Sequence, residues 1–81
     1  MTIRWEDGAK ASYRKSVMRD QDGAVAVLGA VDALAADPYP EPPLGVHKGE
    51  YHRLHIGPYR VHYFVDGDVI TIKRVDRVIT P

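Results

Sequence analysis

The chain has 81 residues, of which 44% are hydrophobic and 27% charged, and its 11 basic and 11 acidic side chains give a formal net charge of +0. This composition is ordinary for one folded domain and excludes the disordered and collagen-like classes. The absence of cysteine excludes disulfides, thiolate metal sites and thiol nucleophiles, and the balanced charge argues against strong nonspecific attraction of the whole molecule to nucleic acid.

The charge is unevenly distributed along the chain. Residues 1–50 carry six Lys/Arg against eight Asp/Glu, whereas residues 51–81 carry five against three and hold three of the four histidines. Residues 1–10 lack the apolar core of a signal peptide, and the longest Ala- and Val-rich run is too short to span a bilayer. We therefore expect a cytoplasmic protein without a membrane role, whose basic character lies in its C-terminal part.

The first half of the chain predicts a short strand and two helices. Residues 2–5 alternate in character as a strand does, and Asp7, which follows, is suited to cap a helix. Apolar side chains at every fourth position favour a helix over residues 9–19, and the segment 20–23 ends it. A second helix is predicted over residues 24–36, where a clearer apolar stripe consists of Ala24, Val27, Val31 and Leu34.

The second half predicts a loop and then a sheet. Residues 38–45 hold four of the six prolines, which favours an extended, polyproline-like loop rather than a helix or a strand. From Tyr51 onward, three runs rich in Val, Ile and Tyr are separated by Gly57-Pro58 and Asp66-Gly67, and this pattern predicts a three-stranded antiparallel meander. Gly57 tolerates the positive φ at the first central position of a type II′ turn, and the proline suits the second.

The two-residue turn at Gly57-Pro58 determines which side chains of the first hairpin share a face. It places His55 opposite Arg60 and Arg53 opposite His62, because residues equally distant from the turn pair across the two strands. Alternate side chains point to opposite sides of a sheet. One face is therefore apolar and carries Leu54, Ile56, Tyr59, Val61 and Tyr63, and the other is basic and carries Arg53, His55, Arg60 and His62.

A second two-residue turn at Asp66-Gly67 extends both faces onto the third strand. In this register Arg60 lies opposite Lys73. Arg74 then points to the apolar side, a misfit that a β-bulge would repair. The extension adds Ile70 and Ile72 to the apolar face, and Lys73 and Arg77 to the basic face.

The apolar stripe of residues 24–36 needs a surface to cover, and the apolar face of the meander supplies one. The predicted fold is therefore α+β: a short N-terminal strand, a two-helix hairpin and a three-stranded antiparallel meander, with the helices packed on one face of a twisted sheet. The basic face stays open, and no carboxylate is assigned to it. Between its basic residues lie Tyr51, Phe64, Val69, Thr71 and Val75.

The open basic face suggests a phosphate ligand. Basic groups about 5 Å apart across strands repel one another, so an anion is their natural partner. Cleavage of RNA by its own 2′-hydroxyl needs a base, fixed cations around the phosphate and an acid for the departing 5′-oxygen, and no metal. His55 or His62 is a competent proton acceptor, because histidine titrates near neutral pH, whereas arginine stays charged and binds phosphate. Tyr51 or Phe64 could stack on a base.

The same residues allow other interpretations. Antiparallel sheets commonly leave one polar face solvated. A metal site at His55 and His62 is disfavoured, because arginines opposite both histidines and the lack of a nearby carboxylate would repel a divalent cation. His47 and His52 suit structural positions, and the two serines of the first predicted helix have no histidine at a spacing suggestive of a serine triad.

The order of these elements, with residues 51–63 (YHRLHIGPYRVHY) and 69–75 (VITIKRV), resembles the RelE/ParE superfamily of bacterial toxins. The most specific part is the pattern basic-Leu-basic-aliphatic-Gly-x-Tyr-Arg-Val-x-Tyr, followed by an Asp/Gly turn and a β-branched strand. The likeness covers nearly the whole chain. It implies a single RelE-like domain over residues 1–81, acting as the toxin of a type II toxin–antitoxin system.

The RelE branch of the superfamily implies a specific activity. Such a toxin enters the ribosomal A site and cleaves messenger RNA without a cofactor, a cognate antitoxin neutralises it, and operator DNA is bound only by the complex of the two. The resemblance assigns catalytic positions to Arg53 and His55, with His55 as the base, and the phosphate-stabilising position to Arg60. Arg77 takes the place of a further family arginine. The RNA-binding residues are then Tyr51, His62 and Lys73.

Two other functions stay open beside this one. The ParE branch implies a binding inhibitor of DNA gyrase, for which the basic face is incidental. A third function is a non-toxic module that binds an antitoxin and represses their shared promoter. The balanced charge and the lack of an aromatic residue after Arg77 depart from the nuclease pattern of the family.

Overall fold

The computed structural model describes residues 1–78, which form two helices and five strands in an α+β arrangement. In chain order these are β1 (Thr2–Trp5), α1 (Asp7–Ser16), α2 (Gln21–Ala33), β2 (Gly45–Lys48), β3 (Tyr51–Ile56), β4 (Tyr59–Asp66) and β5 (Val69–Arg77). The strands form one sheet in the order β1-β5-β4-β3-β2, with β1 parallel to β5 and the other neighbours antiparallel. The predicted fold class is confirmed, and residues 79–81 of the predicted domain lie outside the described residues.

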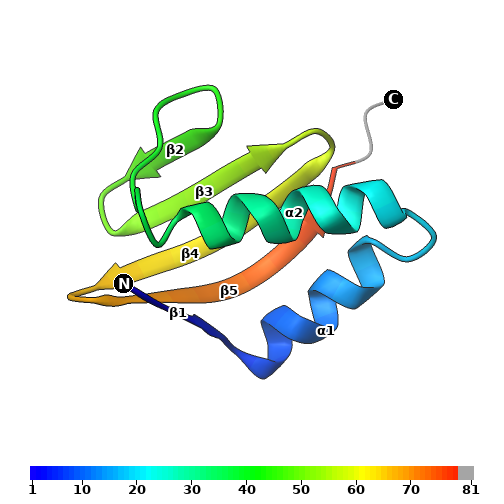
Figure 1. The fold of residues 1–81 in the computed structure, drawn as a ribbon, viewed down its shortest axis with the longest axis horizontal. Helices are drawn as coiled ribbons and strands as arrows, with labels where there is room; N and C mark the ends of the chain where they lie inside the picture. The colour runs from blue at the N-terminus through cyan, green and yellow to red at the C-terminus, as the bar shows by residue number, and fades with distance from the viewer. Residues whose placement is uncertain (79–81) are drawn as a thin grey trace.

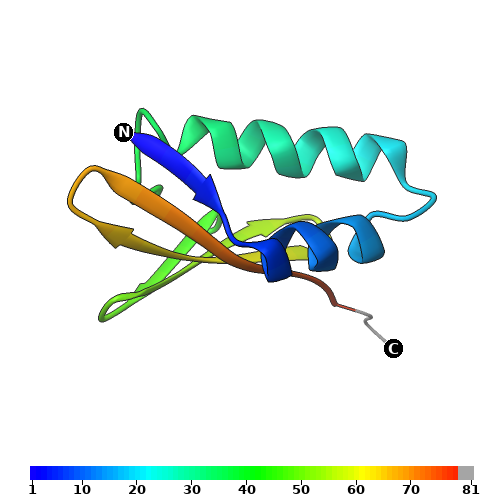
Figure 2. The same ribbon diagram turned by 90° about the horizontal axis from the view of Figure 1, so that it is seen from below.

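The helices and the sheet form two layers. Figure 1 shows α2 crossing the sheet over β3 and β4, while α1 lies beside β5 beyond the end of β1. Seen from its side in Figure 2, the sheet carries α2 on one face, and no helix of residues 1–78 covers the other. Neither helix in this part of the chain is long and apolar enough to cross a membrane.

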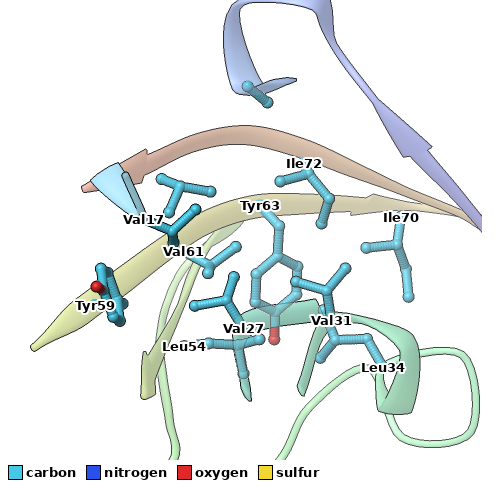
Figure 3. Close-up of a cluster of buried hydrophobic side chains, with 12 residues drawn as sticks. Val17, Val27, Val31, Leu34, Leu54, Tyr59, Val61, Tyr63, Ile70 and Ile72 are labelled. Atoms are coloured by element: carbon cyan, nitrogen blue, oxygen red, sulfur yellow. The ribbon is translucent and has the colours of Figure 1, made fainter. Parts of the chain in front are cut away.

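The hydrophobic core lies between the helices and the covered face of the sheet (Figure 3). Val27, Val31 and Leu34 of the predicted stripe are buried there, whereas Ala24 is only partly buried. Each large apolar side chain so buried contributes about 1.5–3 kcal/mol relative to an exposed position. The sheet supplies Leu54, Tyr59, Val61, Tyr63, Ile70, Ile72 and Val75.

Asp20 begins the second helix rather than ending the first. Its side chain accepts a hydrogen bond of 3.0 Å from the backbone N–H of Gly23, which satisfies one of the unpaired donors of the first turn. For this reason α2 begins at Gln21 and not at Ala24, where the spacing of the apolar residues predicts its start. Asp7 lies in the first turn of α1, and Glu6 occupies the N-cap position without a side-chain hydrogen bond, so the predicted cap at Asp7 was wrong.

The strand β2 was not predicted. Residues 38–44 form the expected loop, but Gly45 belongs to β2, which pairs with β3. Gly45 is needed at this point because a Cβ atom there would overlap the carbonyl oxygen of Pro40. The loop is held to the core by Tyr63, whose hydroxyl donates a 2.8 Å hydrogen bond to the carbonyl of Pro38, and burial raises the pKa of Tyr63 to about 12.

The register of β3 against β4 is the predicted one. His55 lies opposite Arg60, and Arg53 lies opposite His62. Gly57 between the strands has a φ of 54°, in the left-handed region that glycine tolerates without a steric penalty. The four basic residues of the hairpin therefore share the face that α2 leaves open.

The register of β4 against β5 differs from the predicted one. Asp66 pairs with Val69, so the two turn residues are Gly67 and Asp68. A register shift follows between His62 and Tyr63, and it leaves Lys73 as an extra residue in β5. The β-bulge that was predicted in order to turn Arg74 away from the apolar side is therefore present. Beyond it Val75 turns into the core, whereas Asp76 turns to the open face and lies opposite Arg60. The predicted outward position of Val75 and the predicted pairing of Arg60 with Lys73 were wrong.

Two serines of α1 complete the hydrogen bonding of β5 where β1 ends. The backbone N–H of Val75 donates to Oγ of Ser12 at 2.9 Å, and Oγ of Ser16 donates to the carbonyl of Val75 at 3.0 Å. Unpaired backbone groups in a buried strand are costly, so these hydroxyls replace the missing neighbouring strand. The two serines thus have a structural role at the sheet edge.

Candidate functional site

The open face gathers the four predicted hairpin residues Arg53, His55, Arg60 and His62 into one basic cluster, which we call the basic face. Nε of Arg53 donates a hydrogen bond of 2.9 Å to Nε2 of His55. The guanidinium of Arg60 donates through Nη1 to the carbonyls of Gly57 and Tyr59, at 2.8 and 3.0 Å. Arg60 is thereby fixed against the turn beside His55, its cross-strand partner.

The surroundings of His55 favour its neutral form. Burial lowers the pKa of His55, and the charges of Arg60, Arg53 and His62 lower it further. Because Nε2 accepts the hydrogen bond from Arg53, the ring nitrogen with a free electron pair faces a permanent cation. A neutral imidazole among fixed cations can accept a proton from a group that binds to those cations.

The basic face contains a carboxylate that the sequence interpretation did not assign. Asp76 lies opposite Arg60, and its Oδ2 is 3.1 Å from Nε2 of His62. Its other oxygen accepts a hydrogen bond of 2.7 Å from Nε of Arg74. The expectation of an entirely cationic surface was therefore wrong, because the bulge exchanges the faces of the residues that follow it. The sequence signal for this exchange is the adjacent charged pair Lys73-Arg74 between the buried Ile72 and Val75.

His62 is bound on both sides of its ring. The hydroxyl of Tyr51 lies 2.6 Å from Nδ1, opposite the nitrogen that contacts Asp76. Burial lowers the pKa of His62, and Arg53 and Arg74 act in the same direction, whereas the carboxylate of Asp76 opposes them. The environment of His62 thus differs from that of His55, whose charged neighbours are all cationic.

An aromatic pair and a lysine extend the basic face toward β1. The rings of Tyr51 and Phe64 meet edge to face, with centroids 5.9 Å apart, and both are exposed. Nζ of Lys73 lies 5.5 Å from the centre of the Phe64 ring and 2.9 Å from Oε1 of Glu6. Lys73 is therefore on the predicted face, but an acidic partner already neutralises part of its charge.

Arg77 does not belong to the basic face. It pairs with Tyr59, whose side chain is buried on the side of the helices. Its positive charge contributes to lowering the pKa of Asp20 and acts on Tyr59 in the same direction. The predicted place of Arg77 on the basic face was therefore wrong, because the bulge in β5 turns this residue to the opposite side.

His47 and His52 form a separate pair on the covered side, near the loop. Their Nδ1 atoms are 2.9 Å apart, and Nε2 of His47 lies 2.7 Å from the carbonyl of Pro40. Since a carbonyl only accepts, His47 carries its proton on Nε2 and accepts at Nδ1 from His52. His52 is buried and stacks on Tyr63 with ring centres 5.3 Å apart. No group of three or more His, Cys, Asp or Glu suited to a metal ion occurs within residues 1–78.

The chain matches a protein family over nearly its whole length. Residues 3–78 match the family described as the ParE toxin of the type II toxin-antitoxin system, parDE. None of the curated proteins matches the chain. The family match spans the helices and all five strands.

Several solved structures share this fold at low sequence identity. The toxin–antitoxin complex RelBE2 from Mycobacterium tuberculosis is 23% identical, with a TM-score of 0.70 over 94% of this chain and 95% of that one. A chromosomal ParDE system from P. aeruginosa is 22% identical, with a TM-score of 0.69 over 98% and 97%. The YoeB/ParE toxin from Agrobacterium tumefaciens is 14% identical, with a TM-score of 0.75 over 98% and 100%. At these identities the likeness shows a shared fold.

Proposed function

Because the chain belongs to the ParE toxin family of type II toxin–antitoxin systems, we propose that it is the toxin of such a module and cleaves messenger RNA on the ribosome. The observation that best supports a ribonuclease activity is the hydrogen bond between Arg53 and His55, with Arg60 opposite His55 on the next strand. This arrangement places a neutral proton acceptor between two permanent cations. Binding of a phosphodiester needs the cations, and attack by its own 2′-hydroxyl needs the acceptor.

The reaction follows from the roles of these three side chains. The guanidinium groups of Arg53 and Arg60 bind the phosphate and stabilise the negative charge that grows on it. When Arg53 turns to the phosphate, Nε2 of His55 is released from its hydrogen bond. His55 then takes the proton of the 2′-hydroxyl as its oxygen attacks phosphorus. Loss of such a base costs about 100- to 10,000-fold in rate.

RNA contacts extend along the same face. The exposed rings of Tyr51 and Phe64 offer a surface on which an unpaired base can stack, which is how many proteins bind single-stranded RNA. Lys73 lies beside Phe64, and its ammonium group can release the carboxylate of Glu6 and bind a phosphate of the RNA in its place. The net charge of the chain is +0, so attraction to RNA depends on this local surface and not on the whole molecule.

A cognate antitoxin is the second partner of the proposed toxin. The M. tuberculosis structure is named as a toxin–antitoxin complex, and its toxin fold is shared by this chain. In the proposed module, operator DNA is bound by the complex and not by the toxin alone. Residues on the helical side stay accessible for such a protein, because Val25 and Leu28 of α2 are exposed.

The family match also favours a second candidate function. The matching family is described by the ParE toxin, and the ParE branch implies inhibition of DNA gyrase by binding. In that case the basic face has no chemical role. Induction would then trigger DNA damage signalling while translation continues at first.

Mapping of messenger RNA ends by primer extension tests the proposal. The protein is induced in cells and, separately, added to messenger RNA with and without ribosomes. We expect cuts within translated codons that require ribosomes and that disappear in the double variant His55→Ala, Arg60→Ala. The single variant Arg14→Ala, which removes an exposed arginine of α1, is the matched control and should cut normally. Intact messenger RNA with the wild-type protein, or unchanged cutting by the double variant, would reject this mechanism.

A further inference from the structure

A chain of hydrogen-bonded side chains crosses the basic face from β3 through β4 to β5. The hydroxyl of Tyr51 lies 2.6 Å from Nδ1 of His62, and Nε2 of His62 lies 3.1 Å from Oδ2 of Asp76. Arg74 donates to the second oxygen of Asp76, so this carboxylate is an ionised acceptor and Nε2 of His62 carries a proton. The chain ends in a tyrosine that is 47% exposed, whereas only 15% of the His62 side chain is exposed.

From this geometry we propose that Tyr51 is the general acid of the cleavage reaction and that His62, held by Asp76, resupplies its proton. The inference rests on the ribonuclease activity proposed above. It gives a chemical role to Tyr51 and His62, which the sequence analysis assigned only to RNA binding. Tyr51 touches the substrate and is the catalytic residue, whereas His62 and Asp76 act through it.

Two proton transfers occur in the proposed relay, from Tyr51 to the departing oxygen and from His62 to Tyr51. The relay requires His62 to be charged when a phosphate is bound to Arg53, so that its Nδ1–H donates to the oxygen of Tyr51 and the tyrosine proton points to the substrate. As the bond between phosphorus and the 5′-oxygen breaks, the Tyr51 hydroxyl protonates that oxygen. The Nδ1 proton of His62 moves to the tyrosine oxygen at the same time. The products are a 5′-hydroxyl, a restored Tyr51 and a neutral His62 that still donates from Nε2 to Asp76.

The positions of the acid and the base fit an in-line displacement. In such a reaction the attacking and departing oxygens lie on opposite sides of phosphorus. Arg53 contacts His55 through Nε and lies opposite His62 in the register of the hairpin. Along the same face of β3, Tyr51 and His55 lie two residues to either side of Arg53, so a phosphate bound to Arg53 has His55 on one side and Tyr51 on the other.

The two histidines have different electrostatic environments, as an acid and a base require. Arg53, Arg60 and His62 all favour the neutral form of His55 by lowering its pKa. At His62 burial is the largest cause and leaves the pKa below its ordinary value, and Arg53 and Arg74 act in the same direction, whereas Asp76 alone opposes them and supports the charged form. Enzymes that separate the roles of two titratable groups do so by this kind of difference in surroundings.

The variant Tyr51→Phe tests the acid, because it keeps the ring that contacts Phe64 and removes only the hydroxyl. Single-turnover cleavage on programmed ribosomes should slow by about 100-fold or more. Tyr39→Phe, at an exposed tyrosine outside the basic face, is the matched control and should leave the rate unchanged. An undiminished rate for Tyr51→Phe, with active wild-type protein, would overturn the inference and leave the ribonuclease function standing.

A substrate with sulfur in place of the 5′-oxygen separates acid catalysis from RNA binding. A thiolate leaves without a proton, since thiols have a pKa of about 8.5 and alcohols a far higher one. Tyr51→Phe should therefore cleave this substrate at nearly the wild-type rate, whereas His55→Ala should stay slow. Equal slowing of Tyr51→Phe on both substrates would show that the hydroxyl only binds RNA. Failure of the wild-type protein to cleave either substrate would overturn the proposed function, and the acid role with it.

The pH profile of cleavage tests the contribution of Asp76. The rate should fall as the pH rises through the pKa of His62, because the charged ring resupplies the proton. Asp76→Asn removes the group that raises this pKa, so the fall should begin at lower pH than in the wild-type protein. Asp32→Asn, at an exposed position of α2, should leave the profile in place. An unshifted profile for Asp76→Asn would contradict the relay, and a uniform loss of rate at every pH would indicate a purely structural role.

Discussion

The hydroxyl of Tyr59 on β4 donates a hydrogen bond to Oδ2 of Asp20, the residue that caps α2, at a distance of 2.5 Å. Oδ1 of the same carboxylate accepts from the backbone of Gly23. One acidic side chain thus ties the start of the helix to the buried ring of a strand. The bond also explains why the pKa of Asp20 is lowered, first by Tyr59 and then by the Gly23 N–H.

Tyr59→Phe should lower the stability of the protein in a pH-dependent way. The pKa of Asp20 is depressed in the folded state, so its contribution is complete above the pKa of the unfolded chain and is lost as the pH falls through the folded value. We expect a lower urea midpoint for the variant at neutral pH and a smaller difference from the wild type in acid. A difference that does not depend on pH would show that the bond to Asp20 is not its origin.

Gly23→Ala should destabilise the protein although alanine favours helices. A Cβ atom at Gly23 would lie 2.6 Å from Cε2 of Tyr59 and would also overlap the carboxylate of Asp20. Gly29 lies in the same helix with no atom within 4 Å of such a Cβ. We therefore expect Gly29→Ala to stabilise by about 0.5–1 kcal/mol and Gly23→Ala to do the opposite in thermal unfolding. Stabilisation by both substitutions would contradict the packing at Asp20.

Buried His52, which contacts the exposed His47, should make the fold less stable in mild acid. Burial and the neighbouring His47 lower the pKa of His52, so the unfolded chain binds its proton more readily than the folded one. Stability is complete above the unfolded value near 6.5 and falls as the pH decreases below it. His52→Gln should reduce this pH dependence of the unfolding free energy by up to about 1.4 kcal/mol per pH unit. An identical pH dependence in both proteins would show that His52 titrates normally.

Arg77→Gln should leave toxicity intact, whereas Arg60→Gln should abolish it. Both are arginines near the end of the β4–β5 ladder, but Arg77 pairs with Tyr59 and Arg60 with Asp76, on opposite sides of the sheet. Growth after induction, with equal protein levels checked by immunoblot, distinguishes the two. Loss of toxicity in Arg77→Gln with an unchanged melting temperature would support the catalytic role that the sequence analysis assigned to Arg77.

The sequence predicted one hairpin register and missed the other for a physical reason. Gly57-Pro58 offers one two-residue turn, whereas Asp66, Gly67 and Asp68 offer two, which differ in register by two residues. A shift of two residues keeps every side chain on its face, so Ile70 and Ile72 were correctly placed in the core. A bulge shifts the register by one residue and exchanges the faces beyond it.

This exchange accounts for the differences at the candidate site. The sequence identified the hairpin residues of the basic face, since these depend only on the turn at Gly57-Pro58. It missed Asp76 as a neighbour of His62 and misplaced Arg77, since both follow the bulge in β5. The short strand β2 was missed because three of its four residues are exposed. Its pairing with β3 defines this strand, and its own sequence pattern does not.

The place of β5 within the sheet affects when the chain can complete its fold during its own synthesis. β5 lies between β1 and β4 and supplies three buried side chains, Ile70, Ile72 and Val75. Within residues 1–78, the pairing of β1 with β5 joins the strand that is synthesised first with the strand that is synthesised last. We therefore expect the nascent chain to stay incompletely folded until β5 has left the exit tunnel. If the chain cuts messenger RNA on ribosomes, as proposed above, this order of folding would spare the ribosome that is translating it.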